Sequence, residues 1–144
     1  MFLILYYQYY NPESYCYYTL QIVKYTKDQR FNLHHDLGTY DTDTDTVSMN
    51  SPARVVSFFV YLNTLKKIDG GQTEFPKLNL SITPKIGTAI VWSNVRPRQD
   101  PKDLKRYEPD PATVHCGLPL HKKGLQKLGM NIWVLNKMIN VSHV

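Results

Sequence analysis

Cysteine is scarce in this chain, which has only Cys16 and Cys116 among its 144 residues. Two cysteines cannot build a disulfide framework or a zinc cluster of several thiolates, and they leave the redox compartment open. Long apolar runs are also lacking. No stretch approaches the roughly 20 apolar residues that a membrane-spanning helix needs. The sequence therefore predicts neither a disulfide-stabilised scaffold nor a membrane span within these residues.

Charge of one sign is in small excess. Seventeen Lys and Arg residues face twelve Asp and Glu residues, which leaves a formal net charge of +5. This mild basicity suits an anionic ligand but is too small to indicate nucleic-acid binding by itself. Hydrophobic residues make up 42% and charged residues 20%, which is ordinary for a globular protein and unlike a disordered one. Length and composition thus predict one folded domain.

The first residues carry no recognisable targeting signal. The opening residues 1–5 are apolar, but no positive charge precedes them and the run is short for a secretory signal peptide. Seven of the eleven tyrosines follow between Tyr6 and Tyr18, without a periodic pattern. We interpret residues 1–18 as a Tyr-rich N-terminal segment, either disordered or left by a truncated gene model. Residues 19–144 are expected to form the folded domain.

Four apolar segments predict β-strands, because no window repeats convincingly with the 3.6-residue period of a helix. The longest is a nearly continuous apolar run, typical of a strand that is covered on both faces. Turn-forming residues separate the segments, among them Asp69, Gly70 and Gly71. Several short strands between turns favour an all-β sandwich or barrel. The four segments are 20–25, 54–63, 86–94 and 128–135.

His34 and Asp36 form the first pattern that indicates chemistry. Side chains at positions i and i+2 of a strand point to the same face, so the two could reach one metal ion together. A His-x-Asp pattern occurs often by chance, and by itself it is explained more simply by a polar strand end. His115, far along the chain, is the candidate for a third ligand. Two histidines and one carboxylate are the ligand set of non-haem Fe(II) oxygenases, although His115 alone could be an ordinary core histidine.

Lys127 lies at the start of the last apolar segment. A lysine that enters a β-barrel needs an anionic partner, because a buried unpaired ammonium costs several kcal/mol. The distal carboxylate of a dicarboxylate cosubstrate would supply that partner. A solvated lysine at the entry of a strand is the alternative reading of the same residue.

Taken together, these elements resemble the catalytic domain of the prolyl 4-hydroxylase family, within the 2-oxoglutarate and Fe(II)-dependent oxygenases. The resemblance covers roughly residues 19 to 136 and follows the family's order of motifs. The matching elements are Tyr25, His34-His35-Asp36, Arg54, Tyr61-Leu62-Asn63, Gly70-Gly71-Gln72-Thr73, Pro84-Lys85-Ile86-Gly87, His115-Cys116-Gly117-Leu118-Pro119, Lys127 and Trp133.

The resemblance implies a mainly β fold, the double-stranded β-helix or jelly roll, and a metal site. Fe(II) would be held by His34, Asp36 and His115. The implied enzyme is a 2-oxoglutarate-dependent dioxygenase similar to procollagen-proline 4-dioxygenase. It would hydroxylate prolyl residues in a peptide or protein, release succinate and CO2, and use ascorbate as reductant.

The resemblance also implies how the cosubstrate and the substrate are bound. Lys127 would pair with the 5-carboxylate of 2-oxoglutarate, helped by the hydroxyl groups of Tyr25 and Thr73. Arg54 would lie where the family contacts its peptide substrate. No catalytic residue beyond the metal site is implied.

The sequence departs from the family in three respects. The turn after Tyr25 carries Lys27-Asp28-Gln29 where the family usually has a glycine. The helices that usually precede the first strand and support the large sheet have no counterpart in the Tyr-rich segment, so an uncovered sheet face and an oligomer are expectations. The interval between His115 and Lys127 is slightly longer than the common spacing. A shift of one residue in strand register would turn Lys127 outward.

Two other functions stay open at this point. The same cofactor chemistry could act on another substrate, such as a nucleic-acid base, although no interleaving of aromatic and basic residues marks a base-stacking surface. A jelly roll that only binds ligands is the second alternative. The compartment is unknown, and the endoplasmic reticulum is a candidate only through the family resemblance. Residues 41–46 could form a lid or a solvated acidic loop, and residues 96–106 are read as a solvated loop.

Overall fold

The computed structural model describes residues 6–10, 16–50, 53–98 and 107–136, with side chains described in 20–50, 53–98 and 107–133. This part of the chain is mainly β, as the sequence predicts. Its helical turns are three short 3-10 segments: η1 (Lys67–Asp69), η2 (Pro76–Leu78) and η3 (Pro111–Thr113). No helix in the described residues is long and apolar enough to cross a membrane.

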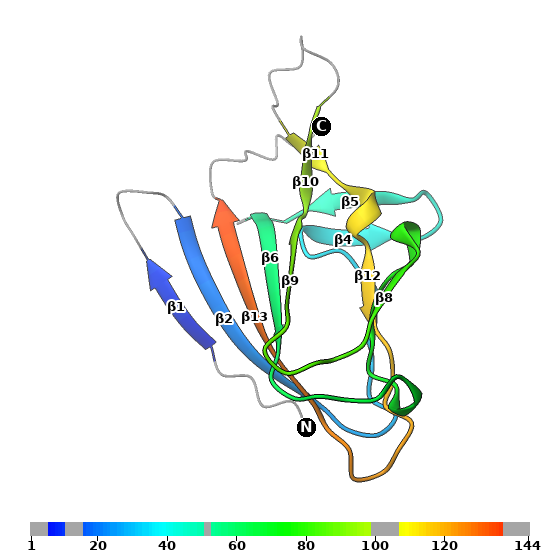
Figure 1. The fold of residues 1–144 in the computed structure, drawn as a ribbon. Helices are drawn as coiled ribbons and strands as arrows, with labels where there is room; N and C mark the ends of the chain where they lie inside the picture. Colours follow the sequence, from blue (N-terminus) through cyan, green and yellow to red (C-terminus); the bar gives the residue numbers. More distant parts are fainter. Residues whose placement is uncertain (1–5, 11–15, 51–52, 99–106, 137–144) are drawn as a thin grey trace.

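The larger sheet contains five antiparallel strands, in the order β1-β2-β13-β6-β9. Four of its strands overlap the four predicted segments. Figure 1 shows it as the curved layer on one side of the molecule. Its strands are β1 (Tyr6–Tyr10), β2 (Cys16–Tyr25), β6 (Ala53–Tyr61), β9 (Ala89–Ser93) and β13 (Lys127–Asn136).

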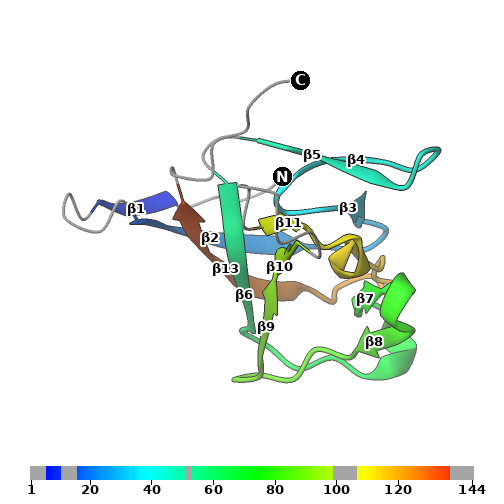
Figure 2. The same cartoon turned by 90° about the horizontal axis from the view of Figure 1, so that it is seen from above.

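A smaller sheet of four strands, in the order β3-β12-β7-β8, faces the larger one (Figures 1 and 2). Two hairpins complete the described fold, β4 with β5 and β10 with β11. Two facing antiparallel sheets with crossing connections make the jelly roll that the sequence predicts. The remaining strands are β3 (Phe31–His34), β4 (Gly38–Asp41), β5 (Thr46–Met49), β7 (Thr73–Phe75), β8 (Leu80–Ile82), β10 (Val95–Pro97), β11 (Tyr107–Pro109) and β12 (His115–Gly117).

The core lies between the two sheets. Its central cluster joins Val23, Phe59, Tyr61 and Trp92 from the large sheet to Phe75 from the small one. Because side chains alternate along a strand, every second residue of a strand can point into this space, as Phe59 and Tyr61 of β6 do. The inner faces therefore supply both the packed core and, at its open parts, the walls of a pocket.

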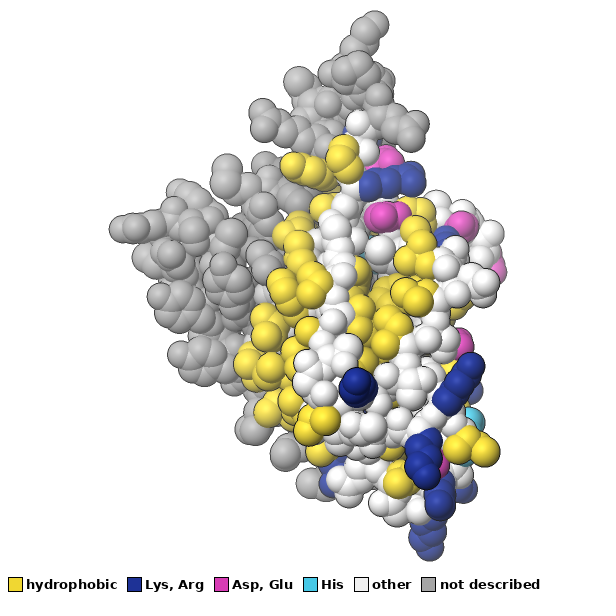
Figure 3. Space-filling model, in the orientation of Figure 1, with side chains coloured by type: hydrophobic (Ala, Val, Ile, Leu, Met, Phe, Trp, Pro, Cys, Tyr) yellow, Lys and Arg dark blue, Asp and Glu magenta, His cyan; other side chains and the backbone are white. Residues whose placement is uncertain are grey.

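The prediction that the apolar run 54–63 forms a strand covered on both faces is wrong for the outer face of the large sheet. Along β6, Ser57, Phe59 and Tyr61 are buried, whereas the alternating Val56 and Phe58 are only half-buried. The apolar run therefore has one fully covered face rather than two. Figure 3 shows hydrophobic side chains gathered along the β9 edge of this sheet, where Val91 is 55% exposed.

The structure describes one predicted loop in full, and the N-terminal segment and the loop 96–106 in part. β1 pairs with β2, and β2 begins at Cys16, so a strand crosses the predicted boundary between residues 18 and 19. The division into two parts stays a prediction. Residues 41–46 close the β4–β5 hairpin, where exposed Asp45 pairs with Lys77. Within the loop 96–106, residues 99–106 lie outside the described residues.

Candidate functional site

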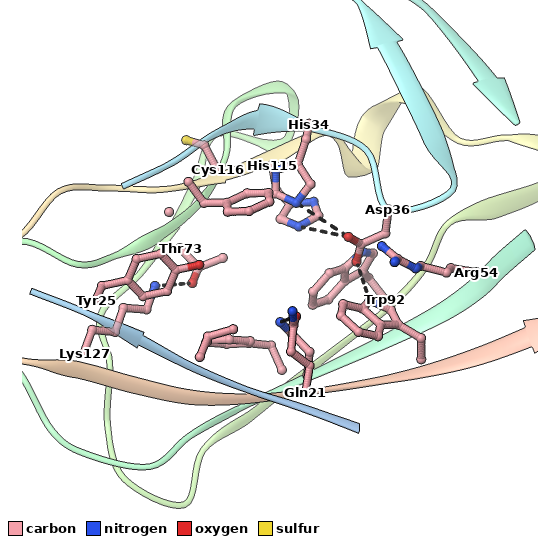
Figure 4. A pocket seen from close by; sticks show the side chains of 16 residues that line it. Gln21, Tyr25, His34, Asp36, Arg54, Thr73, Trp92, His115, Cys116 and Lys127 are labelled. Atoms are coloured by element: carbon pink, nitrogen blue, oxygen red, sulfur yellow. Dashed lines mark hydrogen bonds and ion pairs between the residues drawn. The ribbon is translucent and has the colours of Figure 1, made fainter. Parts of the chain in front are cut away.

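A pocket opens between the two sheets, and the predicted site residues line it (Figure 4). The small sheet contributes His34, Thr73 and His115, with Asp36 just after β3. The large sheet contributes Tyr25, Arg54 and Lys127. Residues that are far apart in the sequence meet here because β2 pairs with β13 in the large sheet, β3 pairs with β12 in the small sheet, and the two sheets face each other.

His34, Asp36 and His115 form a compact cluster at one end of the pocket. His34 ends β3 and His115 begins β12, and the two are register partners across the antiparallel pair. Asp36 Oδ1 lies 3.6 Å from His34 Nε2 and 4.0 Å from His115 Nε2. One candidate ligand atom from each residue lies within 4.8 Å of the others. The structure thus brings these three residues together.

Hydrogen bonds at the other ring nitrogen orient both histidines. His34 Nδ1 lies 2.8 Å from the carbonyl oxygen of Asn32, and His115 Nδ1 lies 2.9 Å from that of Thr113. A carbonyl only accepts, so each Nδ1 carries the proton and donates it. In the neutral form of each ring, Nε2 then presents a lone pair toward the cluster, the form in which imidazole binds a metal.

The charge states of the cluster also suit a cation. Burial lowers the pKa of His115 to about 4, so the imidazole is neutral near pH 7. For Asp36, burial opposes ionisation, but the contacts with His34, His115 and Ser57 together hold its pKa well below the ordinary value. The pocket thus combines an ionised carboxylate with a neutral imidazole. The neighbouring His35 takes no part, because its Nδ1 accepts from Leu37 N and its Nε2 faces the Asp110 carbonyl.

Lys127 lies at the opposite end of the pocket and faces the interior, so the register shift that would turn it outward does not occur. Its side chain is buried, with 3% of the residue exposed. The ammonium lies 5.2 to 5.7 Å from the ring centroids of Tyr25, Phe59 and Tyr61. It donates to Thr73 Oγ1 at 3.4 Å and has no carboxylate partner among the described residues. Burial lowers the pKa of Lys127 to about 8.

The hydroxyl groups around Lys127 converge on the same space. Tyr61, which is fully buried, donates to Thr73 Oγ1 at 2.8 Å. A hydroxyl has two acceptor sites and one proton, and Thr73 accepts from both Tyr61 and Lys127, so its own O–H is left to donate. Burial raises the pKa of Tyr25 to about 12 and keeps that phenol protonated. This end of the pocket offers donors to an anion.

Arg54 is exposed and marks the other rim of the pocket, beside the histidine cluster. Its guanidinium carbon lies 4.3 Å from the ring centroid of Trp133. The indole N–H of Trp133 in turn donates to Asp36 Oδ2 at 3.2 Å. A guanidinium over an aromatic ring keeps N–H donors free for a ligand that binds next to the histidine cluster.

Sequence reasoning missed several polar residues of the site. Tyr61 was assigned no role, although its spacing from Ser57 and Phe59 along one strand already places all three on one face. Gln21 and Asn131 form an amide pair that lines the pocket, with Asn131 Nδ2 donating to Gln21 Oε1 at 3.2 Å. These residues come from β2 and β13, whose mutual register is not readable from the sequence.

Comparison with known proteins identifies the class. A profile of the 2OG-Fe(II) oxygenase superfamily matches residues 20–135, which include all seven predicted site residues. The chain therefore belongs to the 2OG-Fe(II) oxygenase superfamily. Its members are defined by Fe(II) and 2-oxoglutarate, and the donor set of the cluster fits the metal.

The curated relatives that the chain matches include proteins named as prolyl 4-hydroxylases. Prolyl 4-hydroxylase subunit alpha-1 of Gallus gallus is 28% identical over 121 residues, 84% of this chain. A putative prolyl 4-hydroxylase of Acanthamoeba polyphaga mimivirus is 28% identical over 116 residues, 79% of this chain. The chain spans 20% of the length of the first relative and 43% of the second.

Solved structures share the fold. The viral collagen prolyl hydroxylase of Paramecium Bursaria Chlorella virus-1, in complex with 2OG, superposes with a TM-score of 0.65 at 22% identity. The match covers 92% of this chain and 79% of that one. A truncated form of the viral enzyme gives a TM-score of 0.63 at 27% identity, covering 85% and 58%.

Proposed function

We propose that this chain is a dioxygenase that hydroxylates prolyl residues in a peptide or protein, with decarboxylation of 2-oxoglutarate to succinate and CO2. The observation that carries the proposal is the pairing, in one pocket, of a two-histidine, one-carboxylate cluster with a buried lysine. A metal centre alone fits many oxidases. A buried ammonium at the far end of the same pocket fits a cosubstrate that is anionic at both ends.

His34, Asp36 and His115 would hold Fe(II) on one side and leave its other positions open. When bound with 2-oxoglutarate, Fe(II) supplies the oxidising chemistry that cleaves the substrate C–H bond. The protein orients the ligands through the Nδ1 hydrogen bonds and excludes water with the rings of Phe75 and Trp92. Those rings pack 5.3 Å and 4.9 Å from the ring of His115.

Lys127, Thr73 and Tyr25 would bind the distal carboxylate of 2-oxoglutarate. An ammonium and a hydroxyl donate charge-assisted hydrogen bonds, which are stronger than neutral ones. The apolar rings around Lys127 remove water and strengthen that pairing, because the local dielectric is low. Binding of the dianion would also compensate the cost of keeping the ammonium buried.

The substrate would enter from the side of Arg54. The arginine stacked on Trp133 can donate to peptide carbonyl groups, and proline itself supplies no backbone N–H. The relatives named as prolyl 4-hydroxylases support this choice of substrate class. Ascorbate would keep the iron reduced, as the family resemblance implies.

The proposed function is tested in two stages. Fe(II) and then 2-oxoglutarate are added anaerobically, and the weak visible charge-transfer band of the chelate is measured. Proline-rich peptides and matched peptides with alanine in place of proline are then incubated with the protein in air. We expect the band, and succinate release coupled to the gain of one oxygen atom only in the proline series. Coupled turnover of the alanine peptides, or of a nucleic-acid base instead, would overturn the proposed substrate.

Cosubstrate binding is expected to weaken at alkaline pH. The pKa of Lys127 is lowered to about 8, so the ammonium is lost from the ligand-free site as the pH rises through that value. The apparent dissociation constant of 2-oxoglutarate should then rise about tenfold per pH unit, up to the higher pKa that the bound dianion imposes. Calorimetric titration of the metal-loaded protein between about pH 7 and pH 10 measures this. A Lys127→Arg variant, whose cation does not titrate, serves as the control. Constant affinity of the wild type across that range would contradict the prediction.

A further inference from the structure

The two oxygens of Asp36 have different surroundings. Oδ1 faces the metal cluster, 3.6 Å and 4.0 Å from the two histidine Nε2 atoms. Oδ2 points away from them and accepts two hydrogen bonds, from Ser57 Oγ at 2.5 Å and from Trp133 Nε1 at 3.2 Å. Ser57 and Trp133 are both buried, with exposed fractions of 1% and 5%. Water does not compete for this oxygen, so Ser57 and Trp133 both keep their hydrogen bonds to it.

Ser57 is itself held in one orientation. Asn94, which is fully buried directly after β9, donates from Nδ2 to Ser57 Oγ at 2.8 Å and to the carbonyl oxygen of Arg54 at 2.9 Å. The Asn94 backbone is fixed by bonds from its N–H to Val55 O and from Asp110 N–H to its carbonyl. Because Oγ accepts from Asn94, its single proton is directed at Asp36.

We propose that Ser57 is a positioning residue that reserves Asp36 Oδ2 and limits the carboxylate to a single bond to the metal, through Oδ1. This inference rests on the proposed metal site and extends it to a residue outside the pocket wall. A carboxylate with both oxygens available can take two positions around a metal. Three protein ligands on one face of an octahedron leave three positions. A second bond from Asp36 would remove one that the cosubstrate or dioxygen needs.

Substitution of Ser57 tests the positioning of Asp36 more specifically than substitution of Trp133 does. Trp133 also lies beneath the guanidinium of Arg54 and lines the pocket, so its replacement would change the proposed substrate contacts as well. Ser57 does not line the pocket, and Ser57→Ala removes a single oxygen atom. Ser57→Thr restores the hydroxyl and is the matched control. Ser57→Cys has a side chain of similar size whose thiol is only a weak hydrogen-bond donor. It replaces the alanine variant in the test if that variant does not fold.

The test uses Co(II), whose visible absorption reports the number and arrangement of its ligands. Each variant is titrated with Co(II) without oxygen, and 2-oxoglutarate is then added. We expect Ser57→Ala to bind Co(II) about 10-fold or more weakly, in line with losses of outer partners of metal ligands. Its absorption band should also change in position and intensity, and the response to 2-oxoglutarate should weaken. Ser57→Thr should restore all three, and Ser57→Cys should fall between.

Outcomes that overturn the proposal are distinct from failure of the proposed function. Wild-type protein that binds Co(II), with a Ser57→Ala variant of the same affinity and spectrum, would overturn the role of Ser57 alone. A fall in affinity with an unchanged band would also overturn it, because loosened packing rather than carboxylate geometry would then be responsible. Wild-type protein that binds no Co(II) would overturn the metal site and the role of Ser57 with it.

Discussion

The Asp36→Ala variant is expected to lose metal affinity by more than about 100-fold. Loss of an outer partner of a metal ligand typically costs 10- to 100-fold, and Asp36 is itself one of the three candidate ligands. It also supplies the only negative charge of the cluster, between two histidines that bind as neutral rings. Anaerobic titration with Fe(II), followed by the visible band with 2-oxoglutarate, measures the loss. Retention of wild-type affinity by this variant would contradict the assignment of the metal site.

Asp36→Asn is the matched control for folding. In the alanine variant, Ser57 and Trp133 are left as buried donors without their acceptor, and each costs about 1–3 kcal/mol. Asparagine keeps an oxygen for these donors but carries no charge. We therefore expect urea unfolding without metal to show a clear loss of stability for alanine and a smaller one for asparagine. Both variants should bind metal poorly, which would separate the role in binding from the role in folding.

The metal cluster could be predicted only in part from the residues themselves. Strand geometry places His34 and Asp36 on one face, because alternate side chains point the same way. His115, the third member, lies about 80 residues after His34. No spacing rule connects His115 with the pair. The residues alone make His115 only a candidate, and the order of motifs in the family resemblance is what supports adding it to the pair. The structure supplies the physical link, which is the pairing of β3 with β12.

The network around Asp36 could not be predicted at all. Ser57 and Trp133 lie on β6 and β13, in the sheet opposite β3. The contacts between residues of the two sheets depend on strand register and sheet twist. Neither can be predicted from a single sequence. Similarly, an apolar run such as that of β6 indicates a strand but does not say whether its second face is covered. In the structure the outer residues Val56 and Phe58 are half-buried.

Replacement of Lys127 by methionine is expected to have two opposite effects. Methionine has nearly the volume of lysine but no charge, so the pocket keeps its shape. Removing the cation from a buried charge pair costs about 2–5 kcal/mol of binding free energy. At about 1.4 kcal/mol per tenfold, the dissociation constant of 2-oxoglutarate should rise by about 30-fold or more. Metal binding, at the other end of the pocket, should change little.

The ligand-free protein should become more stable with the same substitution. Burial lowers the pKa of Lys127 from 10.5 to about 8, so the unfolded chain binds its proton more tightly than the folded protein does. This difference corresponds to roughly 3 kcal/mol of destabilisation below about pH 8. As the pH rises from about 8 to 10.5, the wild type should regain that stability, whereas Lys127→Met should lack this dependence.

Urea unfolding at about pH 7 and pH 10, together with 2-oxoglutarate titration, tests both effects on the same samples. A lysine that served only the fold would show the reverse result, with Lys127→Met less stable and cosubstrate affinity unchanged. The predicted combination, greater stability with weaker cosubstrate binding, follows only if the buried ammonium is kept for an anion that the folded chain does not itself provide. Lys127→Arg should preserve the charge but misplace its donors, so its cosubstrate affinity is expected to lie between those of the wild type and the methionine variant.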